Sequence, residues 1–112
     1  MSLKRVVKAL VDLGLSSRDT EVYVYLAKKG PKSARNIGTT LNLSKRQLSE
    51  SLRFLYGKGI IHRSFSRSTE YSAVSFEKAV DILLQSKLNE ANVLEKERKR
   101  LLSRWKALDS GL

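Results

Sequence analysis

The sequence contains no cysteine and only one histidine, one proline and one methionine. The absence of cysteine excludes a disulfide framework, a thiolate metal site and a thiol nucleophile, and it favours a reducing intracellular compartment. The lone histidine, His62, lacks the companion ligands that a metal site needs, so we expect it on a strand or at the surface. No apolar run approaches the ~18 residues of a membrane span, and no signal-peptide core follows the first residues. We therefore expect a soluble, cytoplasmic protein without a metal.

The sequence motifs of the common enzyme classes are also missing. There is no glycine-rich phosphate loop, no helix with paired histidines, no serine-centred nucleophile elbow and no acidic cluster. The 112 residues are about one domain's length, and the 41% share of hydrophobic residues is enough for a folded core. These features predict a small folded protein that is not an enzyme and that needs no cofactor.

The positive charge is concentrated in one part of the chain. The formal net charge is +11, and residues 28–67 carry ten Lys and Arg side chains against the single acid Glu50. The segments 1–27 and 68–112 each carry a net charge of only +1. A local field of one sign attracts a polyanion, which favours a nucleic acid partner. A merely solvated basic face and binding to an anionic membrane surface are the alternatives.

The apolar spacing in the first part of the chain predicts four helices and a hairpin. Ser16 and Ser33 are suitable N-caps, and Asn42 is a suitable turn residue before the fourth helix. The run Ser44-Lys45-Arg46-Gln47 has the capping-box pattern, so a helix is expected to begin there. The first expected helix covers residues 3–13, and the second is capped by Ser16 or Ser17 and ends before Gly30-Pro31. The next two cover residues 34 to about 41 and about 44–57, and the expected strands cover 60–65 and 69–74.

Residues 75–108 contain neither proline nor glycine and are dominated by good helix formers, which predicts one long helix. A heptad frame places apolar side chains on one seam, interrupted by Lys87 and Arg98. A long helix with a narrow apolar seam needs a partner, so we expect a homodimer paired as a coiled coil. Alternatively, the helix folds back over its own domain or frays after about Asn92, and parallel and antiparallel pairing both stay open. The expected dimerisation residues are Val80, Leu84, Ala91, Leu94, Leu101, Trp105 and Leu108.

This order of elements is typical of a mainly α fold with a small β-wing, the winged helix-turn-helix, followed by a long C-terminal dimerisation helix. We expect residues 1–74 to form the DNA-binding domain and residues 75–112 the dimerisation helix. In this fold the second helix of the motif lies in the major groove, where each base pair shows a distinct pattern of donors and acceptors. The hairpin is expected to lie on the backbone or in the minor groove. The side chains expected to contact double-stranded DNA are Ser33, Arg35, Ser44, Lys45, Arg46, Gln47, Ser49, Arg53, Arg63 and Arg67.

Individual residue types suggest different contacts. Lys45 and Arg46 suit guanine O6 and N7, and Gln47 suits adenine if it faces outward. Arg53 is expected to meet a phosphate, although basic side chains on an exposed helix also serve solubility alone. The aromatic side chains fall mostly where helices and hairpin must pack, so core packing is expected before base stacking. They are Tyr23, Tyr25, Phe54, Tyr56, Phe65, Tyr71 and Phe76.

Residues 8–75 resemble the TrmB-like branch of winged-helix transcription regulators, relatives of the MarR group. The resemblance rests on Leu13-Gly14-Leu15-Ser16, on Thr20 to Leu26, on Gly30-Pro31 with Ser33 to Ile37, on Leu43 to Leu55 and on Lys58 to Ile61. It implies a mostly archaeal, dimeric DNA-binding regulator. The family often carries a tyrosine where this chain has Ser49, so no base preference is taken from it. Larger members carry an additional sugar-sensing domain that is not expected here, so the resemblance supplies no small-molecule effector.

Three functions fit these features. The first is a sequence-specific dimeric transcription regulator, and the second is a sequence-tolerant, nucleoid-associated protein that contacts only phosphates. The third is a protein-interaction module whose long helix recruits a different chain.

Overall fold

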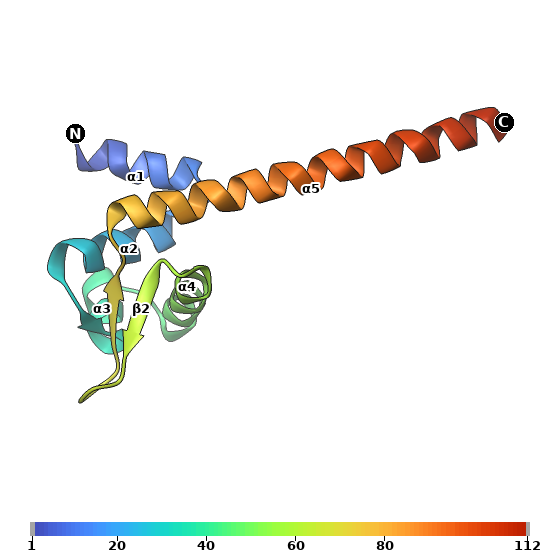
Figure 1. Cartoon of the computed structure of the whole chain (residues 1–112). Coiled ribbons are helices and arrows are strands. Elements are labelled where there is room, and N and C mark those ends of the chain that lie inside the picture. The colour runs from blue at the N-terminus through green and yellow to red at the C-terminus, as the bar shows by residue number, and fades with distance from the viewer. Residues whose placement is uncertain (1, 112) are drawn as a thin grey trace.

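The computed structural model describes residues 2–111 and contains five helices and three short strands within them (Figure 1). The chain is mainly α with a small antiparallel sheet, which confirms the predicted fold class. The outer limits of the two predicted regions, residues 1 and 112, lie outside the described residues. The elements are α1 (Leu3–Asp12), α2 (Ser17–Lys29), β1 (Lys32–Ser33), α3 (Ala34–Leu41), α4 (Lys45–Lys58), β2 (Ile61–Ser64), β3 (Glu70–Ala73) and α5 (Phe76–Gly111).

Each helix in residues 2–111 begins after a serine. The serine hydroxyl accepts a hydrogen bond from the backbone N–H three residues further on, which satisfies one of the free donors at a helix N-terminus. At α4 the cap is reciprocal, because the Ser44 backbone N–H also donates to the Gln47 side chain at 3.0 Å, so the predicted capping box is present. The capping serines are Ser2, Ser16, Ser33, Ser44 and Ser75.

The turn between α3 and α4 depends on two local features. Asn42, the C-cap of α3, adopts the left-handed conformation with φ of 55°, which asparagine tolerates better than most residues. Gly38 is buried where the two helices approach each other, and a Cβ there would lie 3.2 Å from Leu48 Cδ2. The absence of a side chain at Gly38 therefore allows α4 to pack closely against α3.

The sheet has the order β1-β3-β2, with both pairs antiparallel. The hairpin of β2 and β3 agrees with the prediction, but the two-residue strand β1 was not predicted. Tyr23 of α2 fixes the hairpin to the helical body, because its buried hydroxyl donates to the Val74 carbonyl at 2.8 Å. Burial raises the pKa of the Tyr23 hydroxyl, which keeps it protonated as a donor.

The start of α5 packs on the body, whereas the rest of α5 extends away from it (Figure 1). Ala79 and Leu83 are buried in the same core as Leu10, Tyr23 and Leu55. All residues of α5 from Lys87 onwards are exposed, and the chain measures 65 Å along its longest axis. The helix therefore neither folds back nor frays after Asn92. No helix within residues 2–111 combines the length and the apolar character that crossing a membrane requires.

Candidate nucleic-acid interface

Helix α4 presents one face to the core and the opposite face to solvent. Leu52 and Leu55 are buried in the core, and the Ser51 side chain is also fully buried. Lys45, Arg46, Ser49 and Arg53 are exposed on the other side. The 3.6-residue period of the helix therefore places a hydroxyl and three basic side chains along its free face, starting at the positive end of the helix dipole.

The predicted DNA contacts on α3 and α4 meet around Ser49. Ser49 lines a hollow of about 730 Å³ between the two helices together with Arg35 and Lys45. It also lines a second cavity of about 310 Å³ between α4 and the hairpin, together with Arg53 and Arg63. Side chains that are distant in sequence, from Arg35 to Arg63, therefore lie along one continuous surface.

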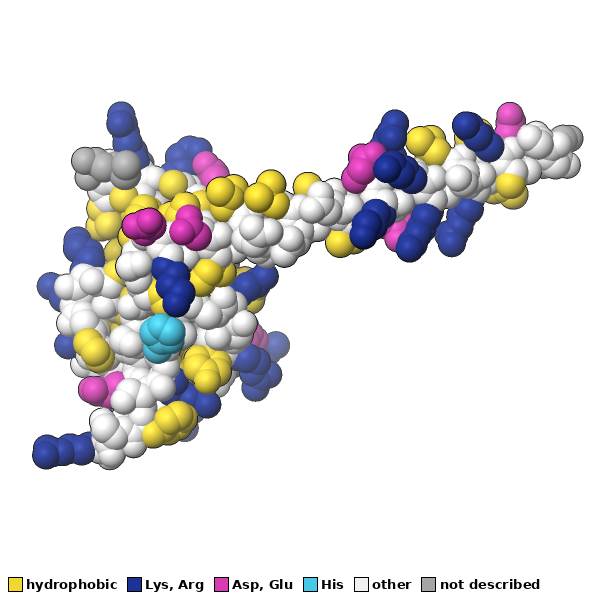
Figure 2. Space-filling view, in the orientation of Figure 1, with side chains coloured by type: hydrophobic (Ala, Val, Ile, Leu, Met, Phe, Trp, Pro, Cys, Tyr) yellow, Lys and Arg dark blue, Asp and Glu magenta, His cyan; other side chains and the backbone are white. Residues whose placement is uncertain are grey.

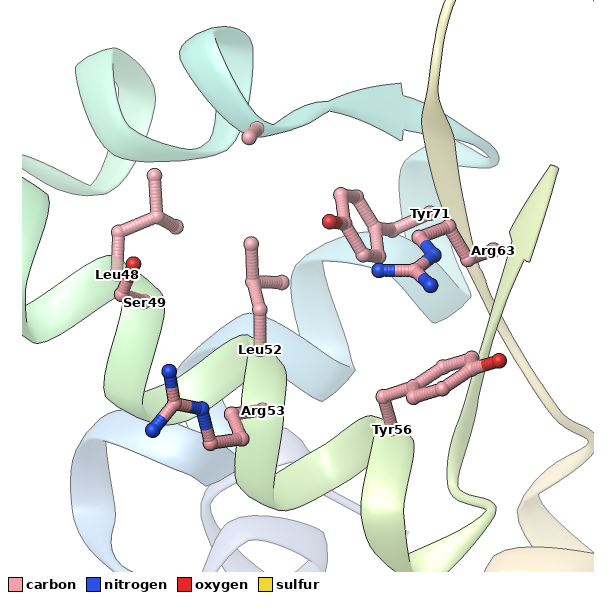
Figure 3. Close-up of a pocket in the computed structure, with 8 residues that line it drawn as sticks. Leu48, Ser49, Leu52, Arg53, Tyr56, Arg63 and Tyr71 are labelled. Atoms are coloured by element: carbon pink, nitrogen blue, oxygen red, sulfur yellow. The ribbon is translucent and has the colours of Figure 1, made fainter. Parts of the chain in front are cut away.

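The second cavity is walled by aromatic and basic groups (Figure 3). The Arg63 guanidinium lies between the rings of Tyr71 and Tyr56, and Arg53, which also lines the cavity, projects from α4 away from Arg63 (Figure 3). Leu48 and Leu52 form the apolar side of the cavity (Figure 3). A phosphate that crosses from the helix to the hairpin would find both guanidinium groups within this surface.

The hairpin adds two arginines, Arg63 and Arg67, to the basic side chains of α4. Arg63 of β2 stacks on two aromatic rings, with its guanidinium carbon 4.7 Å from the centroid of Tyr56 and 4.9 Å from that of Phe65. Such stacking restrains the arginine and leaves the edges of its guanidinium free to donate. Arg67 lies in the loop beyond β2 and is exposed. Figure 2 shows Lys and Arg side chains around the body and at the hairpin tip, with few acidic side chains among them.

Four of the predicted contacts, Ser33, Ser44, Arg46 and Gln47, already make hydrogen bonds within the chain. The Ser33 hydroxyl accepts from the Asn36 N–H at 3.1 Å as the cap of α3. The Gln47 side-chain oxygen accepts from the Ser44 N–H at 3.0 Å. A bidentate contact of Gln47 with adenine needs this oxygen as an acceptor, so that contact would have to open the capping box.

The aromatic expectation was wrong for four residues. Phe54, Tyr56, Phe65 and Phe76 are exposed, whereas Tyr23 is buried as expected. Tyr56 and Phe65 stack on Arg63 instead, a contact that the sequence did not predict. The available signal was the two-residue spacing of Arg63 and Phe65, which places both on one side of an extended strand.

Glu50, the only acid within residues 28–67, joins α2 to α4. Its carboxylate accepts from Arg18 of α2 at 3.1 Å and from Arg46, one turn earlier on α4, also at 3.1 Å. Arg18 additionally donates from Nε to the buried Ser51 hydroxyl at 2.8 Å. Hydrogen bonds from Arg46 and then Arg18 hold the pKa of Glu50 below its usual range. Glu50 therefore stays ionised at neutral pH and neutralises part of the charge that would face DNA.

We expect Glu50→Gln to raise the affinity for random duplex DNA by roughly three- to tenfold, because a negative group leaves the interface and Arg46 is released. Fluorescence anisotropy at a fixed salt concentration measures this change. The control is Glu97→Gln, which removes an acid paired with Arg100 at 3.3 Å on the distant part of α5 and should leave the affinity unchanged. An equal rise in both variants would show that only the net charge matters.

The effect of Glu50 on DNA affinity depends on whether its carboxylate is ionised, and therefore on pH. The pKa of Glu50 is lower in the folded than in the unfolded protein, so the ionised carboxylate contributes to folding stability above the unfolded-state pKa of about 4.3. This contribution is lost as the pH falls through the lower folded-state pKa. Glu50 is therefore ionised throughout the range from about pH 6 to pH 8, and the difference in DNA affinity between wild type and Glu50→Gln should be constant over it.

The helix-turn-helix of α3 and α4, followed by an antiparallel hairpin with a basic face, defines a winged helix-turn-helix, the class of DNA-binding transcription regulators. Solved structures of this class are similar to most of the chain. TrmBL2, an archaeal chromatin protein, is 18% identical with a TM-score of 0.80 over 96% of this chain and 43% of that one. The chain thus spans less than half of that protein's length.

Two further solved structures show the same fold. A possible transcriptional regulator from Methanosarcina mazei is 19% identical with a TM-score of 0.62, covering 89% of this chain and 88% of that one. A MarR family transcription regulator is 15% identical with a TM-score of 0.58, covering 83% of this chain and 65% of that one. No curated protein sequence matches the chain.

Residues 10–77 match the family described as sugar-specific transcriptional regulator TrmB. The chain belongs to this family, which confirms the resemblance found in the sequence. Family and fold are those of DNA-binding transcription regulators and not of enzymes, as predicted.

Proposed function

We propose that the protein is a homodimeric transcription regulator that binds double-stranded DNA sequence-specifically. In this proposal α4 enters the major groove, and the hairpin of β2 and β3 lies over the adjacent backbone or minor groove. The observation that carries it is the single surface on which Lys45, Ser49, Arg53 and Arg63 meet, within a segment of net charge +9. A helix of this size fits the major groove, and its free face holds the side chains that read bases there.

The exposed part of α5 supports the dimer. The side chains of Leu94, Leu101, Trp105 and Leu108 are 59–67% exposed, although they follow the heptad seam of one helix face. Pairing with α5 of a second copy would bury them and would place two α4 helices for two half-sites. In this arrangement residues up to 74 bind DNA, and α5 holds the two copies together.

A sequence-tolerant role in DNA packaging is the second candidate. TrmBL2, which has a TM-score of 0.80 to this chain, is described as an archaeal chromatin protein. The same basic surface would serve this role through phosphate contacts alone, and the engagement of Gln47 in the capping box removes one base reader.

One titration distinguishes these possibilities. Anisotropy is measured with a selected site, with a random duplex of about 30 base pairs and with single-stranded RNA, each at 50 and 200 mM salt. Contacts to 6–10 phosphates should lower the duplex affinity by about 10³- to 10⁵-fold across this range. A preference of ~10³-fold or more for the selected site supports the specific regulator, and a preference of a few-fold supports the packaging role. Weak binding of duplex and RNA with little salt dependence would contradict both.

A further inference from the structure

Phe65 is an exposed aromatic side chain at the far end of the hairpin. It follows β2 (Ile61–Ser64) directly and is 67% exposed, as much as any large hydrophobic side chain in residues 2–111. Alternation along the strand places it on the same side as Ile61, which is buried, and Arg63. Phe65 therefore continues the inward face of the strand beyond the point where the core ends.

The only cationic group over the ring of Phe65 in the described chain is the Arg63 guanidinium, 4.9 Å from its centroid. Tyr56 holds the same guanidinium from the side of α4, at 4.7 Å. The stack directs Phe65 toward the surface that carries α4. It does not bury the ring, because two thirds of the side chain remains accessible.

The surroundings of Phe65 are small and basic. Serines occupy positions 64, 66 and 68, and Arg67 lies between the last two. The hairpin projects beyond α3 and α4 (Figure 1), and Figure 2 shows hydrophobic side chains next to Lys or Arg side chains near its tip. A narrow ribbon with short polar side chains and positive charge is complementary in shape and sign to the minor groove of a duplex.

We infer that the protein bends DNA, with Phe65 inserted as a wedge between two base pairs from the minor-groove side. An apolar side chain inserted in this way unstacks one base step and kinks the duplex by about 20–90°. Arg63 and Arg67 flank the wedge and would contact the phosphates on either side of the opened step. The inference rests on the proposed function, because α4 in the major groove brings the hairpin to the neighbouring minor groove.

The test measures bending and binding separately. A duplex of about 30 base pairs with a central flexible pyrimidine–purine step carries a donor and an acceptor dye at its ends, and energy transfer reports the end-to-end distance. Anisotropy of the same duplex reports binding. Wild type should raise the transfer efficiency on binding. Phe65→Ala should remove this rise, whereas Phe65→Leu, which keeps an apolar wedge, should retain most of it.

A second readout uses a duplex with a nick at the central step. Deforming nicked DNA costs less, so wild type should bind it about tenfold more tightly than intact DNA, and Phe65→Ala should reduce this preference to about one. The matched control is Phe76→Ala, which removes another exposed aromatic ring, at the start of α5, and should leave bending and the nick preference unchanged.

Three other outcomes would overturn the inference. If wild type binds the duplex without a change in transfer efficiency, there is no bending, although the proposed function stands. If Phe65→Ala weakens binding but bends DNA as wild type does, Phe65 only positions Arg63. If wild type does not bind the duplex at all, the proposed function fails as well.

Discussion

Replacing Lys45 and Arg46 together by alanine is expected to weaken binding to a selected duplex by roughly 100-fold or more. Both side chains are exposed on the first turn of α4, and that of Arg46 is 89% accessible. A bidentate contact to the correct base contributes about 1–3 kcal/mol, so two such contacts account for this loss. Alanine is a good helix former, and the Ser44–Gln47 capping box is retained, so α4 should still form.

The measurement is anisotropy with selected and random duplexes over a salt series. If the two side chains read bases, the selected site loses far more affinity than the random duplex. If they contact phosphates, both duplexes lose affinity equally, and the slope of log K against log salt falls by about one for each lost contact. The matched control is Lys96→Ala with Arg100→Ala, which removes the same two residue types from the distant part of α5. Equal losses in both double variants would contradict a role for the start of α4.

Local patterns made much of the fold predictable. Ser44 and Gln47 carry the start of α4 in four consecutive residues, and the long run without glycine or proline defines α5. These signals act within one or two turns of helix, where the partner groups lie close in sequence. The ends of the predicted helices and of the hairpin strands therefore lie within about three residues of those in the structure.

The missed features depend on contacts that are distant in sequence. Strand β1 consists of only Lys32 and Ser33, and it exists because these residues pair with Tyr71 and Glu70 of β3. The charge pair of Arg18 with Glu50 joins residues 32 positions apart. Neither pairing leaves a periodic pattern in the sequence, so neither could be predicted from it.

The candidate site was only partly predictable, because some of its features also depend on contacts that are distant in sequence. Residue type and charge led to the prediction of Arg63 and a basic face as the site, and its DNA contacts stay a prediction, but burial of an aromatic ring depends on what lies opposite it in the fold. Phe65 has the alternation of a core residue, and the body ends before anything covers it. The seam of α5 shows the same limit, because its first two turns bury Ala79 and Leu83 in the core while the predicted seam residue Leu84 is 47% exposed.

The largest effect on assembly is expected from Leu101→Lys with Leu108→Lys. We expect this double variant to be a monomer at micromolar concentration and wild type to be a dimer. Two α5 helices that pair along the seam would bury four leucines at these two positions, and each is worth about 1.5–3 kcal/mol when fully buried. Lysine at these positions places charges within the apolar seam, and opposite their own copies in a parallel pair. Analytical ultracentrifugation measures the mass directly.

The same variant distinguishes the dimer from other uses of α5. Ser103 and Ser110 lie on the opposite face of the heptad frame, so Ser103→Lys with Ser110→Lys adds the same charge away from the seam and should remain dimeric. On a duplex with two half-sites the seam variant should lose about 10²- to 10⁴-fold in affinity, because the second site is no longer bound by a tethered copy. Its affinity for a single half-site should be unchanged, since no residue of α4 or the hairpin is altered. A wild-type protein that stays monomeric at tens of micromolar, with a DNA affinity equal to that of the seam variant, would instead assign the exposed seam to a different chain.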